Sequence, residues 1–185
     1  MLPTYAAGER FTTNHLAYRL RLPLTNRTLA RWDFPKRGEV ITCRSPRRPD
    51  VIVLKRVIGL PGDEIFIREG IIYLNGEPIP QPAQPPTAEE GEIFREALDG
   101  VIYRVTYRTF GSKLLTEIPT ETLTENEASE KDEELKSVFP NWSSPDAPHR
   151  VGADAVFVLG DHRDKSIDSR IWGDVPFEFV MGRVR

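Results

Sequence analysis

The chain has 185 residues, enough to bury a core as one domain with or without an excursion. Its formal net charge of -3 gives no reason to expect nucleic acid as a partner. The hydrophobic content of 39% is ordinary for a soluble protein, and no run approaches the roughly 18–20 apolar residues that span a bilayer.

Short strands dominate the predicted elements. Six runs of β-branched or alternating residues, each bounded by Gly, Pro or Asp, predict strands at 39–43, 51–58, 64–67, 71–74, 101–108 and 155–159. The turn Pro61-Gly62-Asp63 and further reversals make 51–80 a meander of antiparallel strands. The predicted fold class is mostly β. The single cysteine, Cys43, excludes an internal disulfide and sits in a strand-like run, which indicates a buried, inert thiol.

The middle of the chain has a different composition. Residues 78–92 are rich in Pro, Gln and Glu and predict a surface loop, while 116–136 are acidic and polar. A short solvated helix is expected at 125–138, because its acidic residues come early and Lys136 comes late. We therefore predict a β core formed by 1–80 and 151–185, and an inserted, smaller β and loop region at 81–150 whose strand pairs in a satellite sheet.

Lys55 lies inside an apolar run that ends in a Gly-Leu-Pro-Gly turn. Strand alternation places it on one face with Val53 and Val57, and places Arg56 on the other face. A lysine desolvated among aliphatic groups has a lowered pKa, so it can accept a proton from a serine hydroxyl near neutral pH. The alternative is a lysine on an edge strand whose ammonium stays in water, and the run alone does not separate the two.

A second segment, 160–173, follows a buried strand and is dense in charges of both signs. Its ionisable residues are Asp161, His162, Arg163, Asp164, Lys165, Asp168 and Arg170, and Asp174 follows directly after the segment. Arginine–carboxylate pairs can hold such a loop rigid beside a site, and the hydroxyls of Ser166 and Ser169 can orient an amine. A merely solvated loop is the simpler alternative.

The two segments together resemble the lysine-base motif and the glycine-aspartate motif of type I signal peptidases (leader peptidases), which are membrane-bound serine proteases with a Ser–Lys pair. The first motif is matched at Lys55, Arg56, Gly59, Pro61, Gly62 and Asp63. The second is matched at Gly160, Asp161, Arg163, Asp164, Ser166, Asp168, Ser169, Arg170, Trp172 and Gly173. The chain departs from it at His162 and Lys165, where the family usually has asparagines.

The resemblance implies a role for each of four residues in catalysis. Lys55 would be the general base, and Ser166 would hydrogen-bond the lysine amine and aim it. Asp168 and Arg170 would hold the loop in an ion pair. A neutral lysine can take the hydroxyl proton itself, so a Ser–Lys pair needs no aspartate. No metal or organic cofactor is expected, since the three histidines are far apart and show no ligand spacing.

The same resemblance implies a substrate and a location. Met1 and Leu54 would line a shallow apolar pocket for the small side chain that precedes the cleaved bond. The substrates would be exported preproteins with small residues at the cleavage site. The full-length protein would be anchored in the cytoplasmic membrane, with this domain on the extracytoplasmic side.

The first four residues, Met1-Leu2-Pro3-Thr4, resemble the stretch that directly follows the family's catalytic serine. The nucleophile, part of the oxyanion hole and the membrane anchor are therefore expected before Met1, and 1–185 alone is expected to be inactive. Either a fragment of a longer protein or a natural non-catalytic homologue fits this pattern.

Two other functions remain open from the sequence. A self-cleaving repressor-type protease shares the Ser–Lys pair and a related β core, but it would call for a DNA-binding domain and an Ala-Gly cleavage site. The other alternative is a non-catalytic β module from the same family that binds exported peptides by strand addition.

Overall fold

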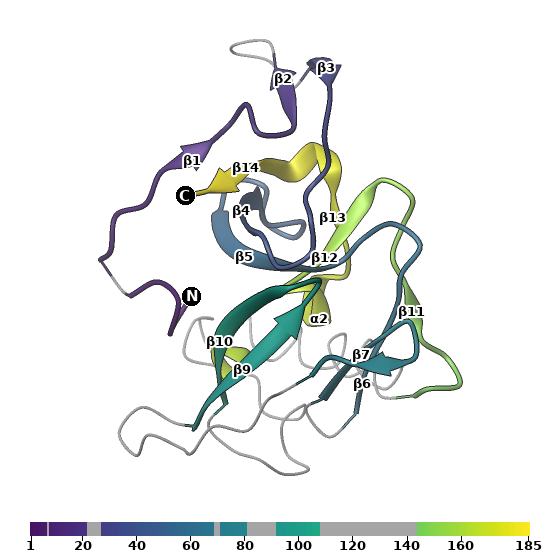
Figure 1. Cartoon of the computed structure of the whole chain (residues 1–185). Helices are drawn as coiled ribbons and strands as arrows, with labels where there is room; N and C mark the ends of the chain where they lie inside the picture. The colour runs from purple at the N-terminus through teal and green to yellow at the C-terminus, as the bar shows by residue number, and fades with distance from the viewer. Residues whose placement is uncertain (7, 22–26, 69–70, 81–91, 108–143) are drawn as a thin grey trace, which may run out of the picture.

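The computed structural model of the chain describes residues 1–6, 8–21, 27–68, 71–80, 92–107 and 144–185 (Figure 1). Its largest sheet has six strands in the order β1-β14-β4-β5-β12-β13, and every neighbouring pair is antiparallel. These strands are β1 (Thr13–Asn14), β4 (Val40–Arg44), β5 (Ile52–Gly59), β12 (Ala155–Leu159), β13 (Val175–Pro176) and β14 (Val180–Val184).

Three smaller antiparallel sheets surround the large one. A four-stranded sheet has the order β11 (His149–Arg150), β6 (Glu64–Arg68), β7 (Ile71–Leu74), β8 (Glu77–Pro78). Two hairpins are formed by β2 (Arg19–Arg21) with β3 (Thr28–Arg31), and by β9 (Glu92–Leu98) with β10 (Val101–Tyr107). Within the described ranges the helical pieces are short: the 3-10 turns η3 (Arg163–Lys165) and η4 (Phe177–Phe179), and the single-turn helix α2 (Ser169–Trp172).

The mostly-β, antiparallel fold class predicted from the sequence is confirmed. All six predicted strands are present as β4, β5, β6, β7, β10 and β12, with bounds that differ from the prediction by at most one residue. The helix expected at 125–138 lies outside the described residues. So does most of the acidic middle region, and the division of the chain into a core and an insertion stays a prediction.

In the second half of β5 both faces are buried, and by different clusters. Val57 belongs to a cluster with Ile41, Cys43, Val156 and Val158 from the large sheet. Ile58 belongs to a second cluster that lies between the sheets and includes side chains of β6, β7, β9, β10 and β12: Ile65, Ile67, Ile72, Leu98, Tyr103, Val105, Phe157 and Leu159. Strand alternation therefore holds on β5, and the β9–β10 hairpin shares a core with the large sheet.

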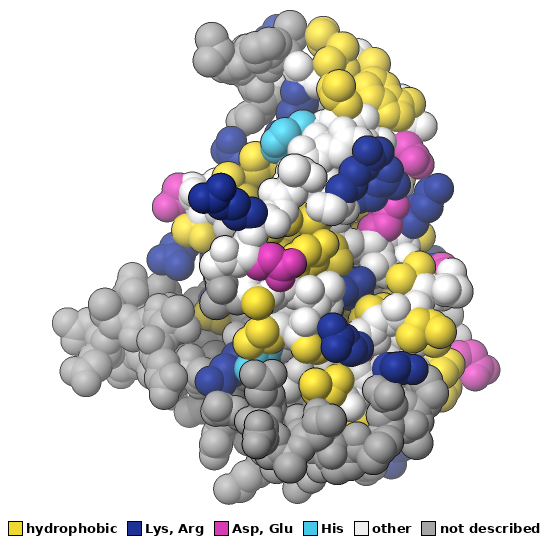
Figure 2. Space-filling view, turned by 60° about the vertical axis from the view of Figure 1, so that its left-hand side comes forward, with side chains coloured by type: hydrophobic (Ala, Val, Ile, Leu, Met, Phe, Trp, Pro, Cys, Tyr) yellow, Lys and Arg dark blue, Asp and Glu magenta, His cyan; other side chains and the backbone are white. Residues whose placement is uncertain are grey.

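The β2–β3 hairpin lies at the far end of the molecule from the β6–β7 sheet (Figure 1). Hydrophobic side chains gather on this end (Figure 2), and its exposed large side chains include Leu20, Leu29 and Trp32. Arg19 of β2 joins this hairpin to η4, because its Nη2 donates to the Glu178 carbonyl at 2.9 Å. None of the helices in the described ranges combines the length and the apolar character that a bilayer crossing requires.

Candidate active site

Lys55 lies in the middle of β5, where Ile41 of β4 is its cross-strand neighbour. Its Nζ donates a hydrogen bond of 2.9 Å to Ser166 Oγ and lies 5.9 Å from the ring centroid of Trp172. Burial lowers the pKa of Lys55 and outweighs the neighbouring carboxylate of Asp168, which raises it. Other charged or titratable neighbours that act on this amine include Cys43, Asp161 and Arg170.

Gly160 lets Ser166 reach the lysine. A Cβ at this position would overlap both the Cβ and the Oγ of Ser166, and would lie 3.6 Å from Lys55 Nζ. The absence of a side chain at the end of β12 therefore makes room for the Lys55–Ser166 hydrogen bond. The glycine matters here for close approach, since its φ is not among the positive ones.

Asp168 organises the loop that carries Ser166. Its fully buried carboxylate accepts from the Gly160 N–H at 2.9 Å, and from Arg170 Nε at 2.8 Å and Nη2 at 2.9 Å. Burial alone would raise the pKa of Asp168, but the charge and hydrogen bonds of Arg170 hold it below the ordinary value. Arg170 Nη2 also donates to the Arg163 carbonyl at 2.5 Å, so the pair fixes the loop backbone as well as the charge.

The second serine of the segment has a structural setting. Ser169 is fully buried, and its Oγ accepts from the Val158 N–H at 2.9 Å. This bond ties the start of α2 to β12. Of the two serines that the sequence offers as partners for an amine, Ser166 contacts Lys55.

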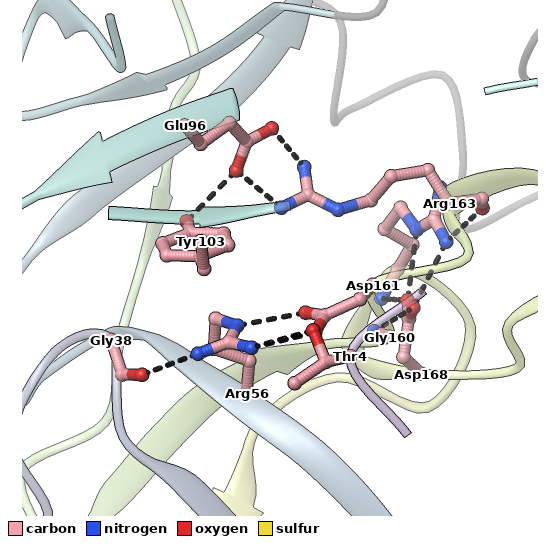
Figure 3. Close-up of polar contacts among 10 residues, drawn as sticks. Thr4, Gly38, Arg56, Glu96, Tyr103, Gly160, Asp161, Arg163 and Asp168 are labelled. Atoms are coloured by element: carbon pink, nitrogen blue, oxygen red, sulfur yellow. Dashed lines mark hydrogen bonds and ion pairs between the residues drawn. The ribbon is translucent and has the colours of Figure 1, made fainter. Parts of the chain in front are cut away.

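A second buried ion pair joins Arg56, the residue after Lys55 on β5, to Asp161 (Figure 3). Arg56 donates from Nε and Nη2 to the two carboxylate oxygens of Asp161, at 2.8 and 2.6 Å, and from Nη1 to the Gly38 carbonyl at 2.7 Å. Thr4 joins this pair, because its hydroxyl donates to Asp161 and accepts from Arg56 Nη2. The first residues of the chain are thereby fastened to the strand that carries the lysine.

The amino terminus of Met1 lies within electrostatic range of Lys55. Burial lowers the pKa of the Met1 amine, and the charge of Lys55 lowers it further. Leu54 is half-buried on β5, opposite Thr42 of β4. The apolar pocket expected from Met1 and Leu54 stays a prediction, as do the catalytic roles of Lys55, Ser166, Asp168 and Arg170.

Several residues that build the site receive no role from the sequence. Arg56, Asp161 and Gly160 are positions of the two motifs, so membership in a motif was the sequence signal that could have placed them near Lys55 and Ser166. Thr4 stands in the stretch that resembles the residues after a catalytic serine. Only its contact with Arg56 and Asp161 shows what its hydroxyl does.

Two of the histidines contact oxygen atoms of the protein. His15 Nδ1 contacts the Met181 carbonyl at 3.2 Å, and His149 Nε2 pairs with Asp174 Oδ1 at 2.7 Å. In the described part of the chain, no three His, Cys, Asp or Glu side chains gather in a way that would hold a metal ion. The site places the Lys55 amine, whose pKa is lowered, next to the Ser166 hydroxyl.

The chain is similar to a known protein family over its whole length. The sequence pattern of the family described as "Signal peptidase, peptidase S26" matches residues 1–185, the full length of the chain. The chain belongs to this family.

Among its relatives, the signal peptidase I of Pseudomonas aeruginosa is 30% identical over 94% of this chain and 52% of its own length. That of Pseudomonas fluorescens is 28% identical over 99% of this chain and 59% of its own length. A crystal structure of a signal peptidase I from Enterococcus faecalis V583 is 22% identical, with a TM-score of 0.44, over 83% of this chain and 98% of that one. The chain thus spans between half and two thirds of the length of these Pseudomonas signal peptidases.

Proposed function

We propose that the protein to which this chain belongs removes signal peptides from exported preproteins, with Lys55 as the general base of a Ser–Lys pair. The observation that best supports this is the 2.9 Å hydrogen bond from Lys55 Nζ to Ser166 Oγ, made by an amine whose pKa burial lowers. A lowered pKa raises the share of neutral amine, and only the neutral amine can take a proton.

The proposed nucleophile is a serine that directly precedes Met1 in the longer protein. The Met1 amine lies in the electrostatic range of Lys55, and the Thr4 bonds to Arg56 and Asp161 hold this end of the chain beside the lysine. A serine joined to Met1 by one peptide bond would bring its hydroxyl to the same neighbourhood.

The proposed reaction has two halves. In the first, Lys55 Nζ accepts the hydroxyl proton as the serine oxygen attacks the scissile carbonyl carbon, and the resulting ammonium gives that proton to the leaving amine as the C–N bond breaks. In the second, Lys55 takes a proton from water, whose oxygen attacks the acyl ester and releases the serine with its proton restored. Ser166 would hold Lys55 through both halves, and Asp168 with Arg170 would hold the loop that carries Ser166.

We further propose that the enzyme works at the outer face of the cytoplasmic membrane on preproteins with small residues at the cleavage site. Met1 and Leu54 would line the pocket for the residue that precedes the cleaved bond. Family membership supports signal-peptide-bearing substrates.

The test compares three proteins on a preprotein with an Ala-x-Ala cleavage site, with products followed by mass spectrometry. A protein extended upstream of Met1 to include the serine should cleave at that site. The same protein with Lys55→Met, and residues 1–185 alone, should bind without cleaving. Cleavage by 1–185 would refute the position of the serine, and binding without cleavage by the extended protein at every pH would favour the non-catalytic peptide-binding module.

A further inference from the structure

A buried glutamate reaches the active-site loop from the β9–β10 hairpin. Glu96 on β9 is fully buried, and its two carboxylate oxygens accept from Arg163 Nη1 at 2.7 Å and Nη2 at 2.5 Å (Figure 3). The hydroxyl of Tyr103, opposite on β10, donates to the same carboxylate at 2.8 Å. Burial and the charge of Glu96 raise the pKa of Tyr103, so the phenol keeps the proton that it donates.

Arg163 connects this carboxylate to the loop of Ser166. It lies in η3, three residues before Ser166, and its carbonyl accepts the 2.5 Å hydrogen bond from Arg170. Arg170 in turn pairs with Asp168, which holds the Gly160 N–H. Movement of Arg163 would therefore be passed to both the backbone and the ion pair that place Ser166 on Lys55.

The same hairpin also contacts the other ion pair of the site. The ring of Tyr103 lies 4.1 Å from the guanidinium carbon of Arg56, and the Thr106 N–H donates to the Asp161 carbonyl at 2.9 Å. Val101 packs so closely on Gly38, whose carbonyl accepts from Arg56, that a Cβ at Gly38 would lie 2.8 Å from the Val101 Cβ. The hairpin thus contacts both the loop of Ser166 and the Arg56–Asp161 ion pair.

A buried ion pair is weak evidence for stability, since removing both charges from water costs about as much as their attraction returns. The bidentate geometry of Glu96 and Arg163 instead fixes a direction and a distance. We propose that Glu96 is a positioning residue, which holds the loop of Ser166 against Lys55 and keeps water from the lysine amine. In its catalytic part this inference rests on the proposed function.

The test replaces the carboxylate by its neutral isostere in Glu96→Gln and titrates Lys55 by NMR, with ¹³C at the lysine Cε atoms. The released loop should admit water to Lys55, so its titration midpoint should rise by about one pH unit or more, a tenfold change in the proton equilibrium. In the protein extended upstream, the midpoint of the acid limb in a plot of kcat/KM against pH should move to higher pH by the same amount. Glu96→Asp, which keeps the charge, should raise the Lys55 midpoint less than Glu96→Gln does.

The matched control is Asp63→Asn. Asp63 is also a buried carboxylate in a bidentate pair, with Arg37 at 2.7 Å, and its other hydrogen bonds come from the Leu60 N–H and from Asn75, which lie outside the loop of Ser166. This variant should lose stability to urea and leave the Lys55 midpoint unchanged. If Glu96→Gln behaves in the same way, Glu96 is merely structural and the inference is wrong.

Two further outcomes separate a failure of this inference from a failure of the proposed function. If Lys55 of the unchanged protein titrates at its ordinary value, the proposed function fails whatever Glu96 does. If Glu96→Gln does not fold, Tyr103→Phe removes one hydrogen bond to the same carboxylate and keeps the ring over Arg56. A smaller upward shift of the Lys55 midpoint is then expected, and no shift would overturn the inference.

Discussion

A single methyl group at Gly160 should disconnect Lys55 from Ser166. The Cβ of a Gly160→Ala variant would overlap the Cβ and Oγ of Ser166, so the serine must move away. Overpacking of this kind costs about 1–3 kcal/mol, and the lost hydrogen bond adds about 1 kcal/mol, which gives roughly 2–4 kcal/mol of lost stability. The backbone at Gly160 is not in the left-handed region, so the effect is steric alone.

The assays for Gly160→Ala separate stability from positioning. Urea unfolding of 1–185 should show the loss of stability, and the protein extended upstream should lose about 100-fold in kcat/KM, as expected for a displacement of about 1 Å at a reacting group. In the double variant Gly160→Ala with Ser166→Gly, the overlapping atoms are gone, so most of the stability should return while the Lys55 hydrogen bond and the activity stay lost.

Gly152→Ala is the control for the same change. A Cβ at Gly152 would meet only Asp174 Oδ2 at 3.6 Å and the Ala155 Cβ at 3.7 Å, which are ordinary contacts. This variant should keep its stability and activity. A Gly160→Ala protein as stable and as active as the Gly152→Ala control would refute the view that Gly160 makes room for Ser166.

Three other predictions follow from the charges of the site. Because burial lowers the pKa of Lys55 in the folded state, the unfolded chain binds more protons at any pH between the folded and unfolded pKa values. Urea unfolding should therefore show that the unchanged protein gains stability relative to Lys55→Met as pH rises across that interval, by up to about 1.4 kcal/mol per pH unit. A stability difference that stays constant with pH would contradict the lowered pKa. Asp168→Asn leaves Arg170 as a buried cation without its carboxylate, so urea unfolding should show a loss of about 3–5 kcal/mol, and a loss below about 1 kcal/mol would mean that the pair does not organise the loop. Burial raises the pKa of Cys43 to about 12, so a thiol reagent should label it only after unfolding in urea, and rapid labelling of the native protein would show an open site.

The strands of the core could be predicted because their signal is local. The runs of β4, β5 and β12 alternate or are continuously apolar, and turn residues bound them, so position and type follow from the sequence. β9 was missed for a physical reason. Its sequence, Glu-Ile-Phe-Arg-Glu-Ala-Leu, is rich in helix formers, and its strand conformation comes from pairing with β10 along its full length.

The site could be predicted only in part, because motifs name residues and not their distances. The Lys55–Ser166 contact was expected from the resemblance and is present in the structure. The contact of Glu96 with Arg163 has no sequence signal, since a glutamate is ordinarily exposed. Only the fold of the hairpin shows that this carboxylate is buried against the loop.

The charges around Lys55 explain why the loop needs an arginine. Asp168 raises the pKa of the lysine and would by itself favour the ammonium, which cannot act as a base. Arg170 forms a two-pronged pair with that carboxylate, and its own charge lowers the lysine pKa. The buried carboxylate can therefore hold Gly160 and the turn of α2 in place while its partner offsets its charge, and burial then decides the state of the amine. An apolar residue at 170 would remove both this offset and the hydrogen bond to the Arg163 carbonyl, so Lys55 would face an unpaired buried carboxylate on a loop that has lost one of its backbone contacts.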